Sequence, residues 1–464
     1  MVSFDKEFIK NEFDRLAGKY NPDGEFEARL YTECNAKRGL RNADGTGIVA
    51  GLTRISNVNV YLINEFERVP VDGELYYRGI NVRDIVNACE KENRFGYEEA
   101  SWLLLFGELP SEQDLSLYRG MIENCRMMPN NFIDDMIMRN PSPDLMNMLA
   151  RSVLSLYSYD ESPDDTSEAN SLRQSMELIA RLPVIMVAAY QAKRRAYDHK
   201  SMYLHMPAEG LSIAENILST LRADRKFTHD EAMLLDRCMI LHAEHGGGNN
   251  SAFVSRAVTS SGTDIYSAIA ASIGSLKGPR HGGANLKVCD MVDDIRDNVK
   301  DLRDDEELTA YLSKILAKEA GDRSGLIYGM GHAVYTKSDP RAVILKAEAE
   351  KMAKAKGFTD EFDLLASIER LTPSLLNKKM IGNTGISANV DMYSGLVYRM
   401  LEIPRELFTP LFAVARMSGW CAHRLEEIQT CRRIMRPAYR PLFHRQPYTE
   451  LKDRGITAEK EEEN

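Results

Sequence analysis

Apolar side chains recur with helical spacing over most of the chain from about residue 80 onward. An apolar residue at every third or fourth position places these side chains on one face of a helix. One such face is formed, at positions i, i+4, i+8 and i+11, by Ile265, Ile269, Ile273 and Leu276. The stretches with helical spacing include residues 98–105, 112–122, 172–197, 265–276 and 286–295. Pro183 falls near the middle of the third stretch and predicts a kink or a break there.

The pattern is different near the N-terminus. Residues 48–53, 58–63 and 74–78 favour extended structure and predict short strands or hairpins. Residues 1–45 carry many charges and predict a peripheral helical arm. We therefore expect a mainly α-helical fold with a small N-terminal β-hairpin region.

Charge density along the chain predicts two domains after the arm. Residues 296–325 and 351–379 are rich in Asp, Glu, Lys and Arg, which indicates a more exposed lobe. We expect a small helical domain over residues 289–402, inserted in a large helical domain formed by residues 46–288 and 403–464. The acidic tail from residue 458 onward is predicted to be disordered.

Composition excludes several classes of protein. The 464 residues include 59 Lys and Arg against 69 Asp and Glu, and the net charge of -10 argues against a general nucleic-acid binder. A local basic pocket for an anionic ligand remains compatible with this charge. The seven cysteines have no paired spacing, which predicts reduced thiols in a cytoplasmic protein. No signal peptide or membrane span is predicted.

Two histidines lie in glycine-rich loops that precede predicted helices. His281 follows Gly-Pro-Arg and precedes Gly-Gly-Ala-Asn, and His332 follows Gly-Met-Gly. Small neighbours leave room beside an imidazole, and the N-terminus of a helix favours a developing negative charge. Histidine also exchanges a proton near neutral pH. The two loops therefore indicate a pocket with acid–base chemistry.

His242 and His245 are three residues apart and share one helix face. This spacing is compatible with metal ligation, with a packed and hydrogen-bonded pair at a helix end, or with one histidine that donates to a substrate anion. The chain has no His-Glu-x-x-His sequence, and no cluster of Cys or His at fixed spacing completes a zinc site.

Two arginines are candidates for anion binding. Asp339 and Pro340 predict a helix start, which places Arg341 in the first turn, where a cation opposes the helix dipole. Such a residue either binds an anion or is a solvated surface arginine. Arg416 lies among small and apolar residues, where a buried guanidinium needs an anionic partner. Arg436 belongs to a basic run, which is most often a solvated face.

Asp391 precedes a helical stretch, so its simplest interpretation is a helix N-cap. A general base in this position needs an apolar shield that raises its pKa. The neighbouring side chains of Val390, Met392 and Tyr393 could supply this shield.

Taken in order, these motifs resemble citrate synthases of the si type over about residues 46–440. The stretches that carry the resemblance are Tyr77-Arg-Gly79, His242-Ala-Glu-His245, Gly278-Pro-Arg-His281-Gly-Gly-Ala-Asn285, Gly329-Met-Gly-His332-Ala-Val-Tyr, Asp339-Pro-Arg341, Asn389-Val-Asp391-Met-Tyr-Ser-Gly395 and Ala415-Arg416-Met-Ser-Gly-Trp420. The resemblance implies a mainly α-helical homodimer whose small domain closes over the substrates.

The resemblance also implies a role for each candidate residue. Asp391 would remove a proton from the methyl group of acetyl-CoA, His281 would hydrogen-bond the enol oxygen, and His332 would polarise and protonate the oxaloacetate carbonyl. The implied oxaloacetate ligands are His245, Arg341, Arg416 and, from the partner subunit, Arg436. The implied CoA contacts are Gly329, Gly331 and Lys337. Acetyl-CoA is a co-substrate, and neither a metal nor another cofactor is expected.

Two residues depart from the family pattern near the expected CoA phosphates, Arg280 and Thr336, and the neighbouring Lys337 could substitute for the lost contact.

The sequence leaves three alternatives open. Within the family, a 2-methylcitrate synthase would use propionyl-CoA, which carries one more methylene group. A metal-dependent hydrolase would use His242, His245, His281 and His332. A non-catalytic acyl-CoA-binding relative is disfavoured because Asp391, His281 and His332 are all present.

Overall fold

The computed structural model describes residues 6–19, 26–42, 46–64, 67–331, 334–335, 337–377, 386–430 and 433–454. The chain divides into two compact units. One unit consists of residues 1–49 and 436–464, and the other of residues 50–435. The predicted division into a large and a small domain stays a prediction.

The first unit contains two helices, α1 (Lys6–Lys19) and α2 (Ala28–Glu33). None of the residues of α2 is buried. From residue 433 to residue 450 the chain is without regular structure, and a short 3-10 turn follows at Leu451–Asp453. The predicted disordered tail lies outside the described residues.

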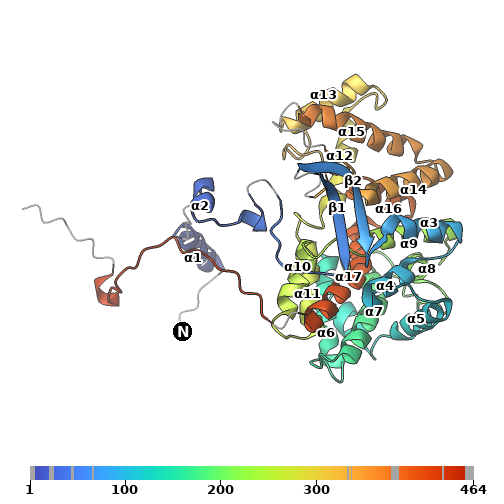
Figure 1. Cartoon of the computed structure of the whole chain (residues 1–464), viewed down its shortest axis with the longest axis horizontal. Helices are drawn as coiled ribbons and strands as arrows, with labels where there is room; N and C mark the ends of the chain where they lie inside the picture. Colours follow the sequence, from blue (N-terminus) through green and yellow to red (C-terminus); the bar gives the residue numbers. More distant parts are fainter. Residues whose placement is uncertain are drawn as a thin grey trace, which may run out of the picture. The chain divides into compact units, whose positions relative to one another are not determined.

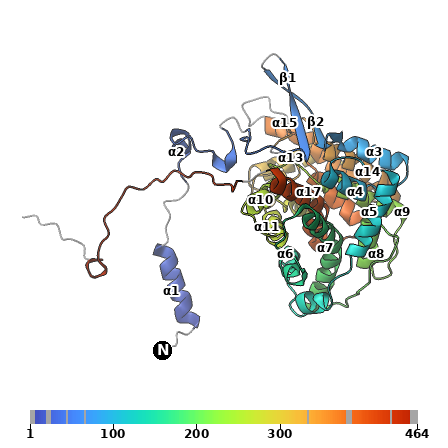
Figure 2. The same cartoon turned by 60° about the horizontal axis from the view of Figure 1, so that its bottom comes forward.

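The second unit confirms the mainly α-helical prediction (Figure 1). Its helices are α3 (Val82–Lys91), α4 (Tyr97–Phe106), α5 (Glu112–Cys125), α6 (Leu145–Leu156), α7 (Glu168–Ala196), α8 (Ile213–Leu221), α9 (His229–His242), α10 (Asn250–Thr259), α11 (Ile265–Lys277), α12 (Ala284–Asn298), α13 (Asp305–Leu316), α14 (Pro340–Lys356), α15 (Thr359–Asn377), α16 (Asp391–Met400) and α17 (Phe408–Thr430). A short π-helical stretch is formed by Ile133–Met138. Figures 1 and 2 both place α13 and α15 far from α6 and α7 within this unit.

The N-terminal β region is an antiparallel sheet of β1 (Ser56–Asn64), β2 (Glu67–Tyr77) and β3 (Ile80–Asn81) in that order. Val58 pairs with Leu75, and the register shifts between Asn59 and Tyr61. The strands predicted at residues 58–63 and 74–78 are confirmed, apart from residue 78. The strand predicted at residues 48–53 is wrong, because this stretch pairs with no strand among the described residues, and the side chains of Val49 and Leu52 are exposed.

Of the kink or break predicted at Pro183, the break does not occur, because α7 runs through this residue as one helix. The kink stays a prediction. A proline inside a helix removes one backbone hydrogen bond and crowds the preceding turn. Here Pro183 is buried, and α7 packs against α5, α6, α8 and α17. Packing on several sides therefore offsets the local cost of the proline.

Helix α17 is the central element of the second unit and packs against α4, α7, α9, α10 and α11 (Figures 1 and 2). Most of its side chains are buried, including Arg416, Trp420 and His423. Polar side chains on such a helix lie inside the protein and require buried partners. The buried polar side chains of α17 are therefore candidates for a functional site.

The six cysteines that the structure describes are free thiols, and Cys431 lies outside the described residues. Among the described helices, none combines the length and the apolar character needed to cross a membrane.

Candidate active site

Two loops that carry predicted site residues lie side by side. The Asn389 N–H donates to the Gly329 carbonyl over 2.9 Å, and its side-chain amide donates to the Gly331 carbonyl over 2.9 Å. The Gly331 N–H in turn donates to the Ser387 carbonyl over 2.8 Å. These bonds fix the glycine loop beside the turn that leads to Asp391. His332 follows Gly331 in the chain but lies outside the described residues, as do Ala333 and Thr336.

Gly329 cannot be replaced by a larger residue without a rearrangement. Its φ of +81° is a left-handed conformation, and a Cβ atom would lie 2.7 Å from the Met392 sulfur. Gly331 also has a positive φ of +87°, but no atom of the described residues lies within 4 Å of a Cβ built there. Lys337 is exposed. The predicted CoA contacts of Gly329, Gly331 and Lys337 stay predictions.

Asp391 is the first residue of α16, and the interpretation of this residue as a helix N-cap is wrong. The Asp391 N–H donates to the side-chain oxygen of Asn389 over 3.0 Å, so Asn389 supplies the acceptor that a cap would provide. Burial raises the pKa of Asp391 to about 6, although Arg341 and Arg416 oppose the shift. The carboxylate is therefore ionised at neutral pH but basic enough to accept a proton.

His281 lies in the turn between α11 and α12, as predicted. Burial, with a smaller contribution from Arg416, lowers the pKa of His281 to about 4, so the ring is neutral at pH 7. A neutral imidazole has one N–H to donate. This donor can stabilise a developing negative charge, as the glycine-rich surroundings suggested.

Ser251 on α10 is a partner of His281 that the sequence did not reveal. Its Oγ lies 3.0 Å from His281 Nε2 and 2.9 Å from Asn249 Oδ1, and it accepts a bond of 3.1 Å from the Trp420 indole. The single Ser251 hydroxyl proton is donated either to Asn249 Oδ1 or to His281 Nε2. In the first case His281 Nε2 carries the imidazole proton, and in the second case Nδ1 carries it. Ser251 can therefore select the tautomer of His281. The only signal in the sequence was the position of Ser251 shortly after the glycine run at residues 246–248.

Arg416 is fully buried on α17 with part of its guanidinium unpaired. Its Nε donates to the His242 carbonyl over 2.6 Å, while Nη1 and Nη2 have no hydrogen-bond partner among the described residues. The guanidinium lies 4.8 Å from the centre of the Phe412 ring. Burial lowers the pKa of Arg416 to about 10, which still leaves it charged at neutral pH. A buried cation with two unpaired donors is suited to receive a carboxylate.

Arg341 lies in the first turn of α14, with Asp339 at the N-cap and Pro340 at the first helical position, as predicted. Arg341 Nη2 lies 2.8 Å and Nε 3.1 Å from the two oxygens of Asp339. Against the cost of burial, this carboxylate raises the pKa of Arg341. The alternative of a solvated surface arginine is wrong, because Arg341 is 4% exposed.

The prediction that His242 and His245 share one helix face is wrong, because α9 ends at His242 and His245 lies in the turn that follows. The two histidines also differ in their surroundings. The His245 ring is buried, with its centre 5.5 Å from that of Tyr335. His242 packs 4.4 Å from Phe412, and burial together with Arg341 and Arg416 lowers its pKa well below 6.5. Neither ring nitrogen of His242 has a hydrogen-bond partner among the described residues, so the proposed hydrogen-bonded pair is not found for this residue.

Electrostatic interactions bring four of the predicted residues together. The charge of Arg416 acts to lower the pKa of Asp391 and of His281. The charge of Arg341 in turn acts to lower the pKa of Arg416. These residues come from α14, α16, α17 and the turn before α12. Arg436 is exposed and belongs to the first unit.

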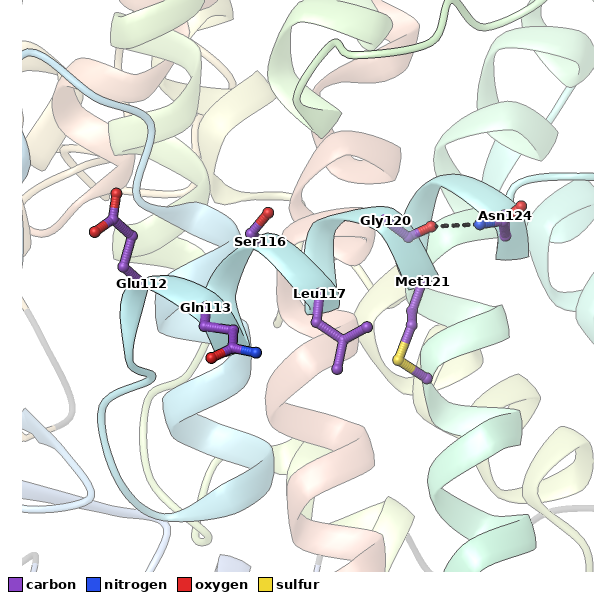
Figure 3. Close-up of a pocket in the computed structure, with 7 residues that line it drawn as sticks. All are labelled: Glu112, Gln113, Ser116, Leu117, Gly120, Met121 and Asn124. Atoms are coloured by element: carbon purple, nitrogen blue, oxygen red, sulfur yellow. Dashed lines mark hydrogen bonds between the residues drawn. The ribbon is translucent and has the colours of Figure 1, made fainter.

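Other features lie apart from these residues. A hollow of about 740 Å³ along α5 is lined by Glu112, Gln113, Ser116, Leu117, Gly120, Met121 and Asn124 (Figure 3). Glu112 is its only ionisable side chain, so the hollow offers little acid–base chemistry. Within the described part of the chain, no three His, Cys, Asp or Glu side chains are grouped as a metal site would require.

The chain is similar to known proteins over most of its length. The sequence model of a family named "Citrate synthase, C-terminal domain" matches residues 43–438. A citrate synthase of Synechocystis is 31% identical over 90% of this chain and 95% of its own, and one of Acidithiobacillus ferridurans is 34% identical over 88% and 95%. A solved citrate synthase of Thermoplasma acidophilum, in a ternary complex with carboxymethyl coenzyme A and oxaloacetate, has a TM-score of 0.72 at 25% identity and covers 90% of this chain and 99% of its own.

Proposed function

Because the chain belongs to the citrate synthase family of condensing transferases, we propose that it converts acetyl-CoA, oxaloacetate and water into citrate and CoA. The observation that carries this proposal is the pair of unpaired nitrogens of buried Arg416 beside Arg341. Oxaloacetate is a dianion, and two adjacent guanidinium groups match its two carboxylates. His245 is proposed as a further ligand.

The first chemical step is removal of a proton from the acetyl group. The methyl protons of a thioester are weakly acidic, so a carboxylate alone removes one inefficiently. Asp391, with its pKa raised to about 6, is proposed as the base. Neutral His281 is proposed to donate a hydrogen bond to the enol oxygen as charge develops there. Together these two groups convert the acetyl group of acetyl-CoA into the enol nucleophile.

The second step joins the enol to the ketone of oxaloacetate. By resemblance, His332 polarises this carbonyl and protonates its oxygen, and the site then hydrolyses the citryl-CoA thioester. Gly329, Gly331 and Lys337 are proposed to contact CoA. Because both reactants are held side by side, much of the rate is expected from their alignment. Closure of the small domain would exclude water until the new carbon–carbon bond exists.

The complete site is proposed to need a second subunit. The family resemblance makes Arg436 a ligand supplied across the interface of a homodimer, and Arg436 is exposed in the single chain. An exposed arginine with a proposed ligand role is consistent with a site completed by another copy.

The test is release of free CoA with each substrate omitted in turn. We expect release only when acetyl-CoA and oxaloacetate are both present, with citrate formed in equal amount. Release from acetyl-CoA alone would indicate a simple thioesterase and would overturn the proposal.

The same assay with propionyl-CoA addresses the choice of acyl group. One methylene group changes the free energy of binding in a pocket by only about 1–3 kcal/mol, so some propionyl-CoA turnover is expected. We expect a higher kcat/KM with acetyl-CoA. A higher value with propionyl-CoA would assign the chain to 2-methylcitrate synthesis.

A further inference from the structure

A buried chain of hydrogen bonds leads from α10 through α17 to the turn after α9. Its members are Arg256, His423 and Glu244, which are 6%, 0% and 0% exposed. His423 Nδ1 lies 2.8 Å from Arg256 Nη2 and 3.1 Å from Arg256 Nε. On the other side of the ring, His423 Nε2 lies 2.8 Å from Glu244 Oε1. None of these side chains has a role in the reaction proposed above.

The chemistry of arginine fixes the direction of these bonds. A guanidinium N–H can only donate, so His423 Nδ1 must accept and the imidazole proton must lie on Nε2. The His423 ring therefore donates to Glu244. Arg256 is itself held by ion pairs to Glu426 and, over 2.9 Å, to Glu427. The whole arrangement directs one donor at the Glu244 carboxylate.

Only one oxygen of the Glu244 carboxylate is bonded. Oε1 also accepts a hydrogen bond of 2.9 Å from the Ser56 hydroxyl. Oε2 is buried without a hydrogen-bond partner among the described residues and occupies space that Gly419 leaves free. Against the cost of burial, His423, Arg416 and Ser56 lower the pKa of Glu244 to about 2. The group is therefore a buried anion with one open oxygen.

Arg416 is a possible ion-pair partner for the open oxygen of Glu244. Arg416 lies one helical turn before Gly419, interacts electrostatically with Glu244, and keeps Nη1 and Nη2 unpaired. A buried carboxylate and a buried guanidinium in such proximity tend to form an ion pair. Among the described residues, however, Oε1 is held by hydrogen bonds and no ion pair joins Glu244 to Arg416. A direct ion pair would occupy the nitrogens that a substrate carboxylate needs.

We propose that the Arg256–His423–Glu244 chain keeps Glu244 as a counter-ion that balances the charge of Arg416 without bonding to its Nη1 and Nη2. His423 and Glu244 are thus positioning residues for oxaloacetate binding, and Ser56 assists them. This inference rests on the proposed function, because it assumes that Arg416 receives a carboxylate of the substrate.

The decisive variant is His423→Ala, which removes the donor and lets Glu244 turn toward Arg416. We expect the KM for oxaloacetate to rise about tenfold, the value of one charge-assisted hydrogen bond, while kcat stays within about twofold. Ser56→Ala should raise KM in the same direction by a smaller factor. Ser56 is only partly buried, so this variant tests the idea even if His423→Ala does not fold.

Two further variants separate positioning from simple stability. His423→Gln can accept from Arg256 and donate to Glu244, so it should keep a KM near the wild-type value. Adding Glu244→Gln to His423→Ala should lower KM again, because a neutral amide forms no ion pair with Arg416. A merely structural role would change thermal stability in all variants but would show neither rescue.

Two results would overturn the inference. One is a wild-type KM in folded His423→Ala and Ser56→Ala. The other is an equally raised KM in His423→Ala with and without Glu244→Gln. Failure of the proposed function is distinguishable, because the wild-type protein would then release no CoA from the two substrates.

Discussion

At the residue scale, the candidate site contains two groups whose ionisation is shifted in the useful direction. Burial raises the pKa of Asp391 to about 6 and lowers that of His281 to about 4. Above about pH 6 the site holds both an ionised base and a neutral hydrogen-bond donor. This is the pairing that enolisation of a thioester requires.

The acid limb of the pH profile should report Asp391. We expect kcat/KM to fall about tenfold per pH unit below pH 6, because the protonated carboxyl cannot act as a base. A steady-state profile between pH 5 and 8 measures this limb. An acid limb centred near pH 4 would contradict the assignment of Asp391 as the base.

Asp391 should also lower stability at neutral pH. Its raised pKa means that the folded protein binds this proton more tightly than the unfolded chain does, so stability is lost as pH rises from about 4 to 6. Asp391→Asn should therefore raise the free energy of unfolding at pH 7 by about 1–3 kcal/mol. Denaturant titration at pH 7 and pH 4 measures the gain, which should disappear at pH 4. A loss of stability of Asp391→Asn at pH 7 would show that the ionised Asp391 carboxylate does not destabilise the folded protein.

Ser251→Ala should impair the orientation of His281 without removing the ring. We expect kcat to fall about tenfold, compared with about 100- to 1,000-fold for His281→Ala. Ser255→Ala is a matched control, because Ser255 lies one turn further along α10 and its buried hydroxyl has no partner among the described residues. Equal rates in the two serine variants would remove Ser251 from the site.

The sequence predicts the residues that carry the chemistry better than those that support them. Asp391, His281, Arg341 and Arg416 stand in recognisable motifs. The supporting contacts of Ser251 and Glu244 join residues 169 and 179 positions apart, to Trp420 and His423 respectively. Only the packing of α17 against α10 and the turn after α9 creates these contacts, so no local pattern could reveal them.

At the element scale, helical periodicity predicts the helices because each helix buries an apolar face against its neighbours. The failures have physical causes. A strand needs a partner, which residues 48–53 lack, and a buried helix can retain a proline such as Pro183 when tertiary packing holds it. Likewise, a simple N-cap rule assigns the cap of α16 to Asp391, whereas the Asn389 side chain accepts the hydrogen bond from the Asp391 N–H.

Gly329→Ala tests how the glycine loop positions α16. The left-handed backbone costs a residue with a Cβ about 1–2 kcal/mol, and the forced contact with Met392 adds about 1–3 kcal/mol. We expect lower thermal stability and, because Met392 adjoins Asp391, a lower kcat. Gly357→Ala is the control, since Gly357 has a φ of +78° and a Cβ built there meets no atom within 4 Å in the part of the chain that the structure describes. Similar losses in both variants would show that the contact with Met392 is unimportant.

At the scale of the whole molecule, the described helices place Arg341, Asp391 and Arg416 in one site but leave Arg436 in another compact unit. Sequence resemblance alone proposes that Arg436 acts across a dimer. Neither periodicity nor the structure of one chain can supply a contact between two copies.

Subunit mixing tests this shared site. Asp391→Asn and Arg436→Leu subunits should each be nearly inactive alone. After mixing and exchange, half of the dimers should be hybrids with one intact site each, which restores about a quarter of wild-type activity. Assay of CoA release after refolding the mixture measures the recovery. No recovery from demonstrated hybrid dimers would place Arg436 outside the site.

The most direct test of the central claim is CoA release from acetyl-CoA and oxaloacetate by wild-type protein and by Asp391→Asn, with a variant of the exposed Asp297, Asp297→Asn, as a control. The account predicts rapid release by the wild type and the control, and a rate about 100- to 10,000-fold lower for Asp391→Asn, as expected for loss of a general base. A wild-type rate in folded Asp391→Asn would contradict it.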